Sequence, residues 1–179
     1  MQPDWPIETE RLVLRPYSEG DLAGLLGIYS DVEVARYLYH EPRGEQETRE
    51  LLERKIAGSS LEQEGHWLSA AVTRDGVLVG DLVLHWASEQ HKTAEIGFSV
   101  DPRHHGHGYA TEAARAFVDW AFAQGFHRVI GRLEARNAAS ARVLEKLGMR
   151  REAHLVENEW VKGEWQSELV YAILDREWR

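Results

Sequence analysis

The sequence contains no cysteine among its 179 residues. Disulfide bridges and a cysteine nucleophile are therefore excluded, which suits a reducing compartment. No apolar run approaches the roughly 20 residues that a membrane-spanning helix needs, and the first residues do not resemble a signal peptide. From these absences we expect a soluble, cytoplasmic protein that is not attached to a membrane.

The sequence also has fewer positive than negative residues: 21 Lys and Arg and 30 Asp and Glu, which gives a formal net charge of -9. This balance argues against a general surface for nucleic acid or anionic membranes, and it mildly favours a cationic partner such as an amine. No repeat or low-complexity linker divides the chain. We therefore expect a single domain over residues 1–179.

A glycine-containing loop at residues 103–110 is the most informative segment. It reads Arg-His-His-Gly-His-Gly-Tyr-Ala and joins a strand-like run at 93–100 to a helix-like run that begins near Tyr109. The first N–H groups of a helix lack partners and carry the positive end of the helix dipole, so such a loop can bind phosphate. Gly106 and Gly108 lack the Cβ atoms that would keep an anion away. The spacing fits neither a Walker A loop nor the dinucleotide motif G-x-G-x-x-G.

The residues after this loop predict a helix, a strand and a second helix. Apolar side chains recur at helical spacing from Ala110 onward, and Gly125 is a natural end for that helix. Alternating apolar and charged residues at 128–135 predict a strand. Residues 141–147 predict a short helix that Gly148 closes.

The first hundred residues predict the other half of one α+β unit. Ser18 and Asp21 have the spacing of a capping box, and Asp75-Gly76 favours a tight hairpin turn. Strands are expected at 11–15, 67–73, 77–86 and 93–100, and helices at 22–29, 31–38 and 45–63.

These segments resemble the GCN5-related N-acetyltransferases (GNAT), which hold acetyl-CoA. The loop matches their Gln/Arg-x-x-Gly-x-Gly/Ala pyrophosphate-binding motif. The run N-A-A-S-A-R-V-L-E-K-L-G-M at 137–149, the start T-E-R-L-V-L-R at 9–15 and the closing K-G-E-W at 162–165 are similar to segments of the RimJ/RimL branch. The resemblance covers nearly the whole chain in the right order.

The resemblance implies an α+β fold built on a mixed, mostly antiparallel sheet of about seven strands, with helices on both faces. Strands 4 and 5, which end near Val100 and Ala135, would run parallel and splay apart. The pantetheine arm would lie in the resulting slot, because splayed strands leave backbone N–H and C=O groups without partners. The residues expected to bind the cofactor are Phe98, Ser99, Val100, Arg103, His105, Gly106, His107, Gly108, Tyr109, Ala110, Asn137 and Ser140.

Transfer of an acetyl group to an amine needs a base, because an alkyl ammonium is mostly protonated at neutral pH. Glu95 is the first candidate, since it lies on the strand that leads into the loop, and several family members use an acid at the corresponding place. Glu159 and, after it, Glu157 are rival candidates. A solvated or salt-bridged glutamate is the alternative interpretation of each.

The thiolate that leaves needs a proton donor. Many members of the family use a tyrosine seven residues after the asparagine, but that position is Leu144 here. The RimJ/RimL branch resembles this chain in carrying a serine three residues after the asparagine, so Ser140 is expected to donate a hydrogen bond to the sulfur. Ser140 and Asn137 could equally serve as helix caps.

Several aromatic and histidine side chains are candidates for the pocket that binds the acceptor, with core packing as the alternative. They are Tyr39, His40, His85 and Trp86, and Glu159 is a further substrate candidate. The loop histidines, His104 among them, are poor evidence for zinc, because neighbouring loop positions without a fourth ligand do not hold the required geometry. No metal is expected.

The sequence therefore predicts an acetyl-CoA-dependent N-acetyltransferase that acts by direct attack of a primary amine, on a protein N-terminus or a small molecule, with no covalent intermediate on the enzyme. Two alternatives stay open. One is an acyl-CoA-binding regulatory module with little catalysis, which the leucine at position 144 suggests. The other is a transferase for a longer acyl-CoA such as succinyl-CoA. A homodimer is also open, because the branch often forms dimers.

Overall fold

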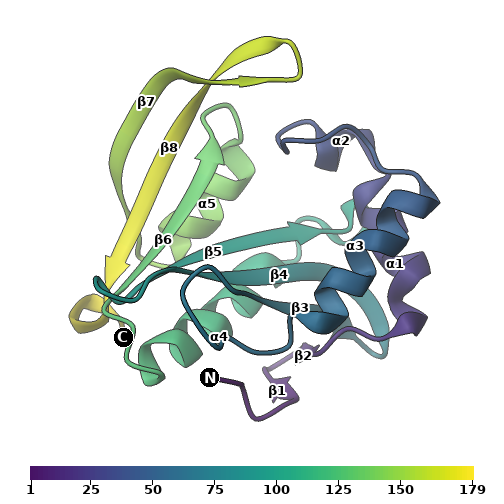
Figure 1. The fold of residues 1–179 in the computed structure, drawn as a ribbon, viewed down its shortest axis with the longest axis horizontal. Helices are drawn as coiled ribbons and strands as arrows, with labels where there is room; N and C mark the ends of the chain where they lie inside the picture. The colour runs from purple at the N-terminus through teal and green to yellow at the C-terminus, as the bar shows by residue number, and fades with distance from the viewer.

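A computed structural model describes the whole chain, residues 1–179. One sheet of eight strands runs through it in the order β1-β2-β3-β4-β5-β6-β8-β7 (Figure 1). The strands are β1 (Ile7–Glu8), β2 (Val13–Arg15), β3 (Trp67–Arg74), β4 (Val77–Ser88), β5 (Thr93–Val100), β6 (Arg128–Glu134), β7 (Arg150–Val161) and β8 (Glu164–Leu174). The α-helices are α1 (Leu22–Tyr29), α2 (Val32–Ala35), α3 (Glu45–Ala57), α4 (Tyr109–Ala123) and α5 (Ala138–Lys146).

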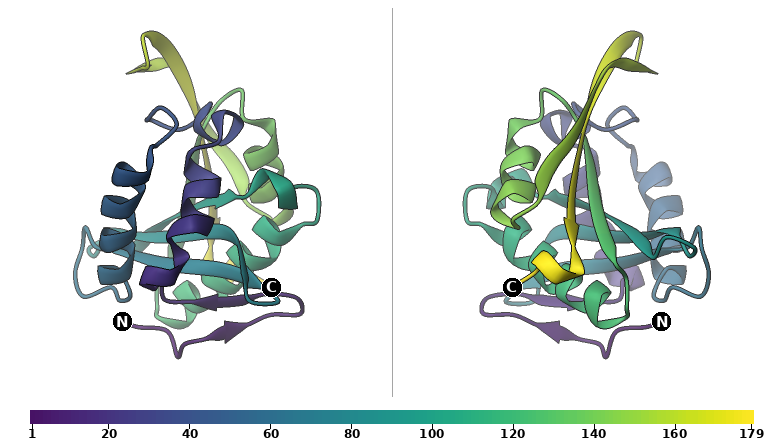
Figure 2. Two further views of the ribbon diagram at one scale, coloured as in Figure 1. Left: turned by 90° about the vertical axis from the view of Figure 1, so that its right-hand side faces the viewer. Right: turned by 90° about the vertical axis from the view of Figure 1, so that its left-hand side faces the viewer.

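The sheet is mixed, and it is covered by helices on both faces, as predicted. Helices α1 and α3 lie on one face, and α4 and α5 lie on the other (Figures 1 and 2). The hairpin of β7 and β8 rises beyond the rest of the sheet, as both views of Figure 2 show. The strand count is eight because the short β1 precedes the first expected strand. No helix is both long and apolar enough to cross a membrane.

The central feature of the sheet is the divergence of β5 and β6, its one parallel pair. These strands are paired only over Thr93–Glu95 and Arg128–Ile130. Beyond that point β5 continues along β4 as far as Val100, whereas β6 continues along β8 as far as Glu134. The predicted splay is therefore present, between the strands numbered β5 and β6.

Local sequence explains where the helices on the first face begin. The backbone N–H of Ser18 donates to Oδ2 of Asp21 at 2.8 Å, which is one of the two bonds of the expected capping box, at a short 3-10 turn that leads into α1. The N–H of Asp21 donates to the carbonyl of Ser18 and not to its hydroxyl. The side chain of Asp31 caps α2 by accepting from the N–H groups of Glu33 and Val34. That helix is shorter than expected and ends at Ala35.

The prediction that α3 extends to residue 63 was wrong. The helix ends at Ala57, and the N–H of Gly58 bonds to the carbonyls of Arg54 and Lys55. The chain after it turns so that Leu61 is fully buried and its N–H donates to the carbonyl of Met1 at 2.8 Å. Burial of one leucine and a contact with the distant N-terminus thus override the local helical pattern.

Helix α5 begins earlier than expected, at Ala138 instead of Ala141. Asn137 is its N-cap, and the asparagine Oδ1 accepts from the N–H of Ser140 at 3.1 Å. Ser140 therefore lies inside the first turn, and it is not the cap. Both residues are good N-caps, and the first one in the chain takes that position.

Two apolar clusters and one buried polar network hold the layers together. The larger cluster packs α4 and α5 on the sheet around Phe117, and the smaller one packs α1 and α3 around Leu25. Asp81 on β4 is buried beneath α1 and α3. Its carboxylate accepts from the hydroxyls of Tyr17 and Tyr29 at 2.7 and 2.5 Å and pairs with Nζ of Lys55 at 2.7 Å.

Candidate active site

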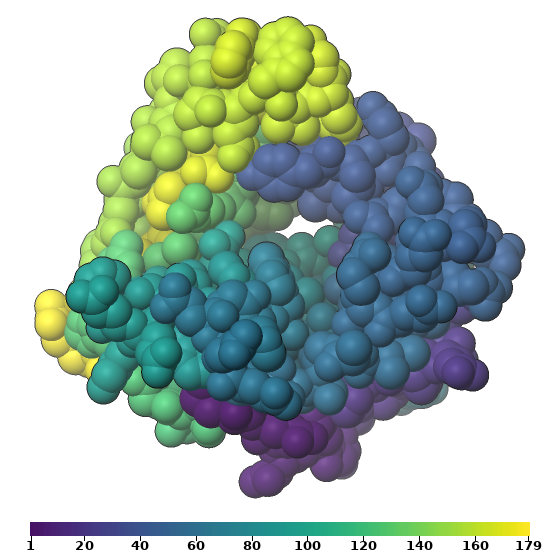
Figure 3. All heavy atoms as spheres, in the orientation of Figure 1, coloured from purple at the N-terminus to yellow at the C-terminus, as the bar shows by residue number.

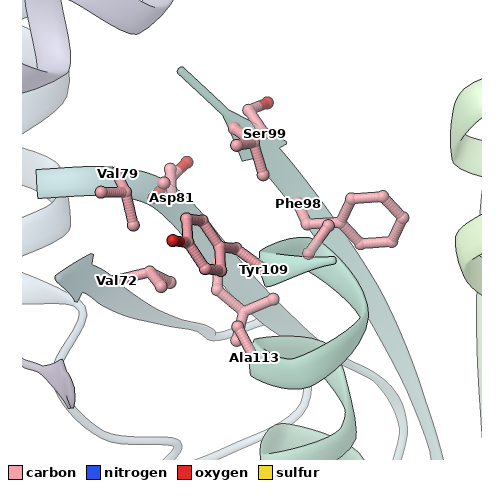
Figure 4. Close-up of a pocket in the computed structure, with 11 residues that line it drawn as sticks. Val72, Val79, Asp81, Phe98, Ser99, Tyr109 and Ala113 are labelled. Atoms are coloured by element: carbon pink, nitrogen blue, oxygen red, sulfur yellow. The ribbon is translucent and has the colours of Figure 1, made fainter. Parts of the chain in front are cut away.

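The slot between β5 and β6 has an unpaired backbone edge. Residues 98–100 are half-buried and pair with β4 on one side only, because β6 has already turned away. N–H and C=O groups on such an edge require a partner, and an extended chain can supply it. Figure 4 shows the side chain of Phe98 pointing away from the small pocket beneath β4 and β5.

The loop after β5 has the backbone shape that an anion cradle needs. Gly106 and Gly108 have φ values of 80° and 79°, and Gly108 is the N-cap of α4. No atom lies within 4 Å of the position that a Cβ on Gly106 would take, so the space over the loop is open. Nε2 of His105 lies 2.9 Å from the carbonyl oxygen of Val100, which ties the loop to the end of β5.

Arg103 is held away from the N-terminus of α4. Its Nε and Nη2 contact the carboxylate of Asp101 at 3.0 and 2.5 Å, and its Nη2 lies beside Gly27 of α1. The guanidinium lowers the pKa of the Asp101 carboxyl, chiefly through this hydrogen bond. Binding of phosphate by Arg103 stays a prediction, and it would need this pair to separate.

Tyr109 contributes its backbone, and not its ring, to the loop surface. The ring is buried and enters the pocket that Val72, Val79 and Ala113 line (Figure 4). Its hydroxyl accepts a hydrogen bond from the guanidinium of Arg74. The side chain therefore fastens the start of α4 to the end of β3, and the N–H groups of Tyr109 and Ala110 remain the candidates for phosphate.

The three loop histidines do not converge. His107 stacks on Tyr109 with ring centroids 5.3 Å apart, while His105 reaches back to Val100. No three His, Cys, Asp or Glu side chains in the structure are grouped so that they could hold a metal ion.

Glu95 lies at the point where β5 and β6 part, on the face that α1 and α3 cover. It is opposite His85 on β4 and Ile130 on β6. Its side chain is 26% exposed, and Oε2 lies 3.6 Å from Nε of Arg132. Burial raises the pKa of the Glu95 carboxyl, and Arg132 opposes that rise. A carboxylate with a raised pKa at the mouth of a slot is suited to accept a proton.

Two further acidic residues border the same face. Glu159 on β7 accepts a hydrogen bond from the hydroxyl of Tyr39 at 2.8 Å, which joins the β7–β8 hairpin to the segment between α2 and α3. Glu168 on β8 is buried, and its carboxylate lies 3.9 Å from Nη1 of Arg132. Burial also raises the pKa of Glu168, and the charges of Glu159 and Glu95 add to the rise.

Sequence reasoning missed Glu168 and Arg132. The signal for Glu168 was its place directly before the apolar run Leu169 to Leu174 on the same strand, because a charge that such a strand buries needs a partner. Arg132 gave no local signal, because arginine on an exposed strand face is ordinary. Only the register of β5, β6 and β8 brings these side chains together.

The other predicted acceptor residues separate into two groups. His85 stacks on Trp67 at 4.4 Å on the same face as Glu95, and burial lowers the pKa of its imidazole. His40 lies near Tyr29, with ring centroids 5.7 Å apart. Trp86 is a correction, because it points to the opposite face and packs against Phe126 at 5.7 Å, in the core.

A hollow lies on this face. Figure 3 shows it between the β7–β8 hairpin above, the segment of α2 and α3 at the right and the central strands below. Tyr39, Glu159 and Glu95 come from the elements that surround it.

On the other side of β6, α5 presents Asn137 and Ser140 at its start. Both side chains are half-buried, and the structure gives no hydrogen bond to the Ser140 hydroxyl. Leu144 is buried against Gly131, where even a Cβ would lie 2.7 Å from the leucine Cδ1. No tyrosine is present there to donate a proton, so Ser140 stays the predicted donor.

A family model, described as an acetyltransferase (GNAT) domain, matches residues 11–150. The chain belongs to the GNAT acetyltransferase family. It is 31% identical to the uncharacterized N-acetyltransferase YnaD of Bacillus subtilis over 96% of this chain and 98% of that protein. It is also similar to the crystal structure of a GNAT acetyltransferase from Bacillus anthracis, at 32% identity with a TM-score of 0.87 over 96% and 99% of the two chains.

The fold is also that of more distant GNAT enzymes. A RimL ribosomal L7/L12 α-N-protein acetyltransferase solved with coenzyme A aligns with a TM-score of 0.81 at 20% identity, over 93% of this chain and 95% of that one. The predicted family and the acyltransferase class are thereby confirmed, and the alignment with RimL agrees with the predicted RimJ/RimL-like branch.

Proposed function

We propose that this GNAT enzyme transfers the acetyl group of acetyl-CoA to a small primary amine that carries a second positive charge. The observation that carries the proposal is the position of Glu95. It lies where the two strands part, with an unpaired backbone edge leading to the glycine loop along β5 and with two more carboxylates on the face that it shares.

The chain has backbone groups that could bind acetyl-CoA. The backbone of residues 98–100 would bond the pantetheine amides, and the N–H groups at the start of α4 would bond the pyrophosphate. Gly106 keeps the approach open, because no atom lies within 4 Å of the position of its missing Cβ. Acetyl-CoA supplies an activated acyl group as a thioester, so the protein needs only to position it, remove one proton and supply another.

The acceptor would enter from the face that α1 and α3 cover. Glu95, Glu159 and Glu168 face the entrance from three strands, and Arg132 is the cation that lies among them. A mildly negative site concentrates cationic substrates. A second ammonium group would find its partner in Glu159 or Glu168 while the reacting nitrogen lies at Glu95.

In the proposed reaction Glu95 accepts a proton from the ammonium, and the free amine nitrogen bonds to the thioester carbonyl carbon. The carbon–sulfur bond breaks as the amide forms. Ser140 donates a hydrogen bond to the departing sulfur, which leaves as the thiol by taking up the proton that the nitrogen loses as the amide forms. The absence of a cysteine to carry the acetyl group fits direct transfer.

A thiol-release assay over an amine panel tests the proposal. The panel comprises diamines and polyamines, monoamines, amino acids and peptides with free N-termini, each with acetyl-CoA and with succinyl-CoA. We expect the highest kcat/KM for diamines with acetyl-CoA, and acetylated product by mass spectrometry. A preference for peptides would contradict the small-amine acceptor and indicate a protein N-terminus. A preference for succinyl-CoA would contradict acetyl-CoA as the donor. Binding of acyl-CoA without turnover of any amine would indicate a regulatory module.

A further inference from the structure

Arg132 on β6 stands at the mouth of the slot and lies between two carboxylates that come from different strands. Its Nε is 3.6 Å from Glu95 on β5, and its Nη1 is 3.9 Å from Glu168 on β8. These are ion-pair distances and are longer than a normal hydrogen bond. The arginine side chain is half-exposed, while the two carboxylates are 26% and 5% exposed.

The other charged and titratable groups around Glu95 do not replace this cation. His85 on β4 lies directly opposite Glu95, and burial lowers the pKa of its imidazole, which favours the neutral form. Lys162 is engaged elsewhere, because its Nζ donates to the carbonyls of Ala35 and Arg36. The remaining groups that face this region are Glu168 on β8, Glu159 on β7 and Tyr39 before α3.

We infer that Arg132 is a positioning residue for the acyl transfer, whose guanidinium holds Glu95 in the ionised form that can accept a proton. The inference rests on the proposed role of Glu95 as the base. Burial raises the pKa of Glu95 and so favours its protonated form, whereas the positive charge of Arg132, 3.6 Å away, opposes that rise. Arg132 supplies this cation from the solvent side, where it leaves the path to the thioester free.

The test removes the positive charge at position 132 and compares the effect with removal of another arginine charge from the same strand. Arg132→Gln deletes the guanidinium, and Arg132→Lys restores a positive charge. Arg128→Gln deletes the same charge from the same strand, at a residue whose partner is Glu152 on β7. Each variant is titrated by carbon-13 NMR of the glutamate carboxyls, with Glu95 assigned from Glu95→Gln, and its kcat/KM is measured from pH 5.5 to 9.5.

In Arg132→Gln we expect Glu95 to titrate about one pH unit higher, as expected for loss of a nearby opposite charge. The acid limb of kcat/KM should move by the same amount, so activity falls about tenfold at low pH and recovers at high pH. Arg132→Lys should restore most of the profile, and Arg128→Gln should leave it unchanged. An unmoved Glu95 titration in Arg132→Gln would overturn the inference. Full activity in Glu95→Gln would instead overturn the base itself, and the NMR titration would still report on Arg132.

Discussion

Among single residues, Glu168 illustrates the conflict between stability and a charged site. The residue is only 4% exposed, and burial raises the pKa of its carboxyl, so the ionised form is less favourable in the folded protein than in the unfolded chain. At neutral pH the ionised form is therefore a cost to folding. That cost disappears on acidification, because the carboxyl in the folded state takes up its proton before the carboxyl in the unfolded state does.

Glu168→Gln should raise the free energy of unfolding at pH 7 by about 1 kcal/mol. The advantage should vanish as the pH falls below the ordinary glutamate pKa of about 4.3. Glu152→Gln is the opposite case, because Arg128 lowers the pKa of Glu152, and this variant should lose stability at pH 7. Urea denaturation at both pH values measures both variants, and a less stable Glu168→Gln at pH 7 would contradict the assignment.

The residues near the slot also show what sequence reasoning can reach. Glu95 could be chosen as a candidate base from the sequence, because it lies on the strand that leads into the glycine loop. Trp86 was wrongly grouped with His85, although adjacent strand residues point to opposite faces, so the two could not both line one pocket. Glu168 and Arg132 were missed because their proximity depends on strand register across the splay, which no local pattern records.

Among the elements, the loop before α4 lies where the sequence placed it, between a strand that ends at Val100 and a helix that begins at Tyr109. The left-handed conformation of Gly106 and Gly108 is a finding of the structure. The start of α5 was misplaced because two possible N-caps, Asn137 and Ser140, lie three positions apart. The end of α3 was misplaced because the chain turns to bury Leu61. The periodicity of the sequence predicted which helices and strands exist. Where each of them begins and ends depends on tertiary contacts that the local sequence does not show.

Gly106→Val tests the loop as a phosphate site. The new side chain would project into the open space over the loop, so we expect acetyl-CoA affinity to fall at least tenfold, or about 1.4 kcal/mol. Gly76→Val is the control, since Gly76 has a similar φ of 78° and equally open surroundings in the β3–β4 turn. Calorimetric titration measures both variants, and equal affinities for the two would place the phosphate elsewhere.

The buried network at Asp81 joins α1 and α3 to β4. Asp81→Asn would leave the ammonium of Lys55 buried without its counter-ion, and we expect a loss of about 3–5 kcal/mol in the free energy of unfolding. Glu45→Gln breaks an exposed pair with Arg49 on α3 and should cost at most about 0.5 kcal/mol. A loss below 1 kcal/mol for Asp81→Asn, about the size of an exposed pair, would contradict a structural role for the network.

For the whole molecule, charge is the property that relates the fold to the acceptor. The chain carries a net charge of -9, and the face where we propose that the acceptor binds holds Glu95, Glu159 and Glu168 against Arg132. With acetyl-CoA saturating, KM for a diamine should therefore rise several-fold between about 50 and 500 mM salt, because salt screens exposed charges over roughly 10 Å. The value of kcat should change little. Initial rates with a monoamine are the control, and an unchanged diamine KM would contradict electrostatic recognition.

The measurement that tests the central claim most directly compares wild type with Glu95→Gln in single-turnover acetyl transfer, with enzyme in excess over acetyl-CoA and the best amine of the panel saturating. We predict that the transfer rate falls by about 10²–10⁴-fold, as for loss of a general base. Affinity for acetyl-CoA should stay within about twofold, because the loop and the edge of β5 are intact. Equal transfer rates in the two proteins would contradict the claim that Glu95 takes the proton.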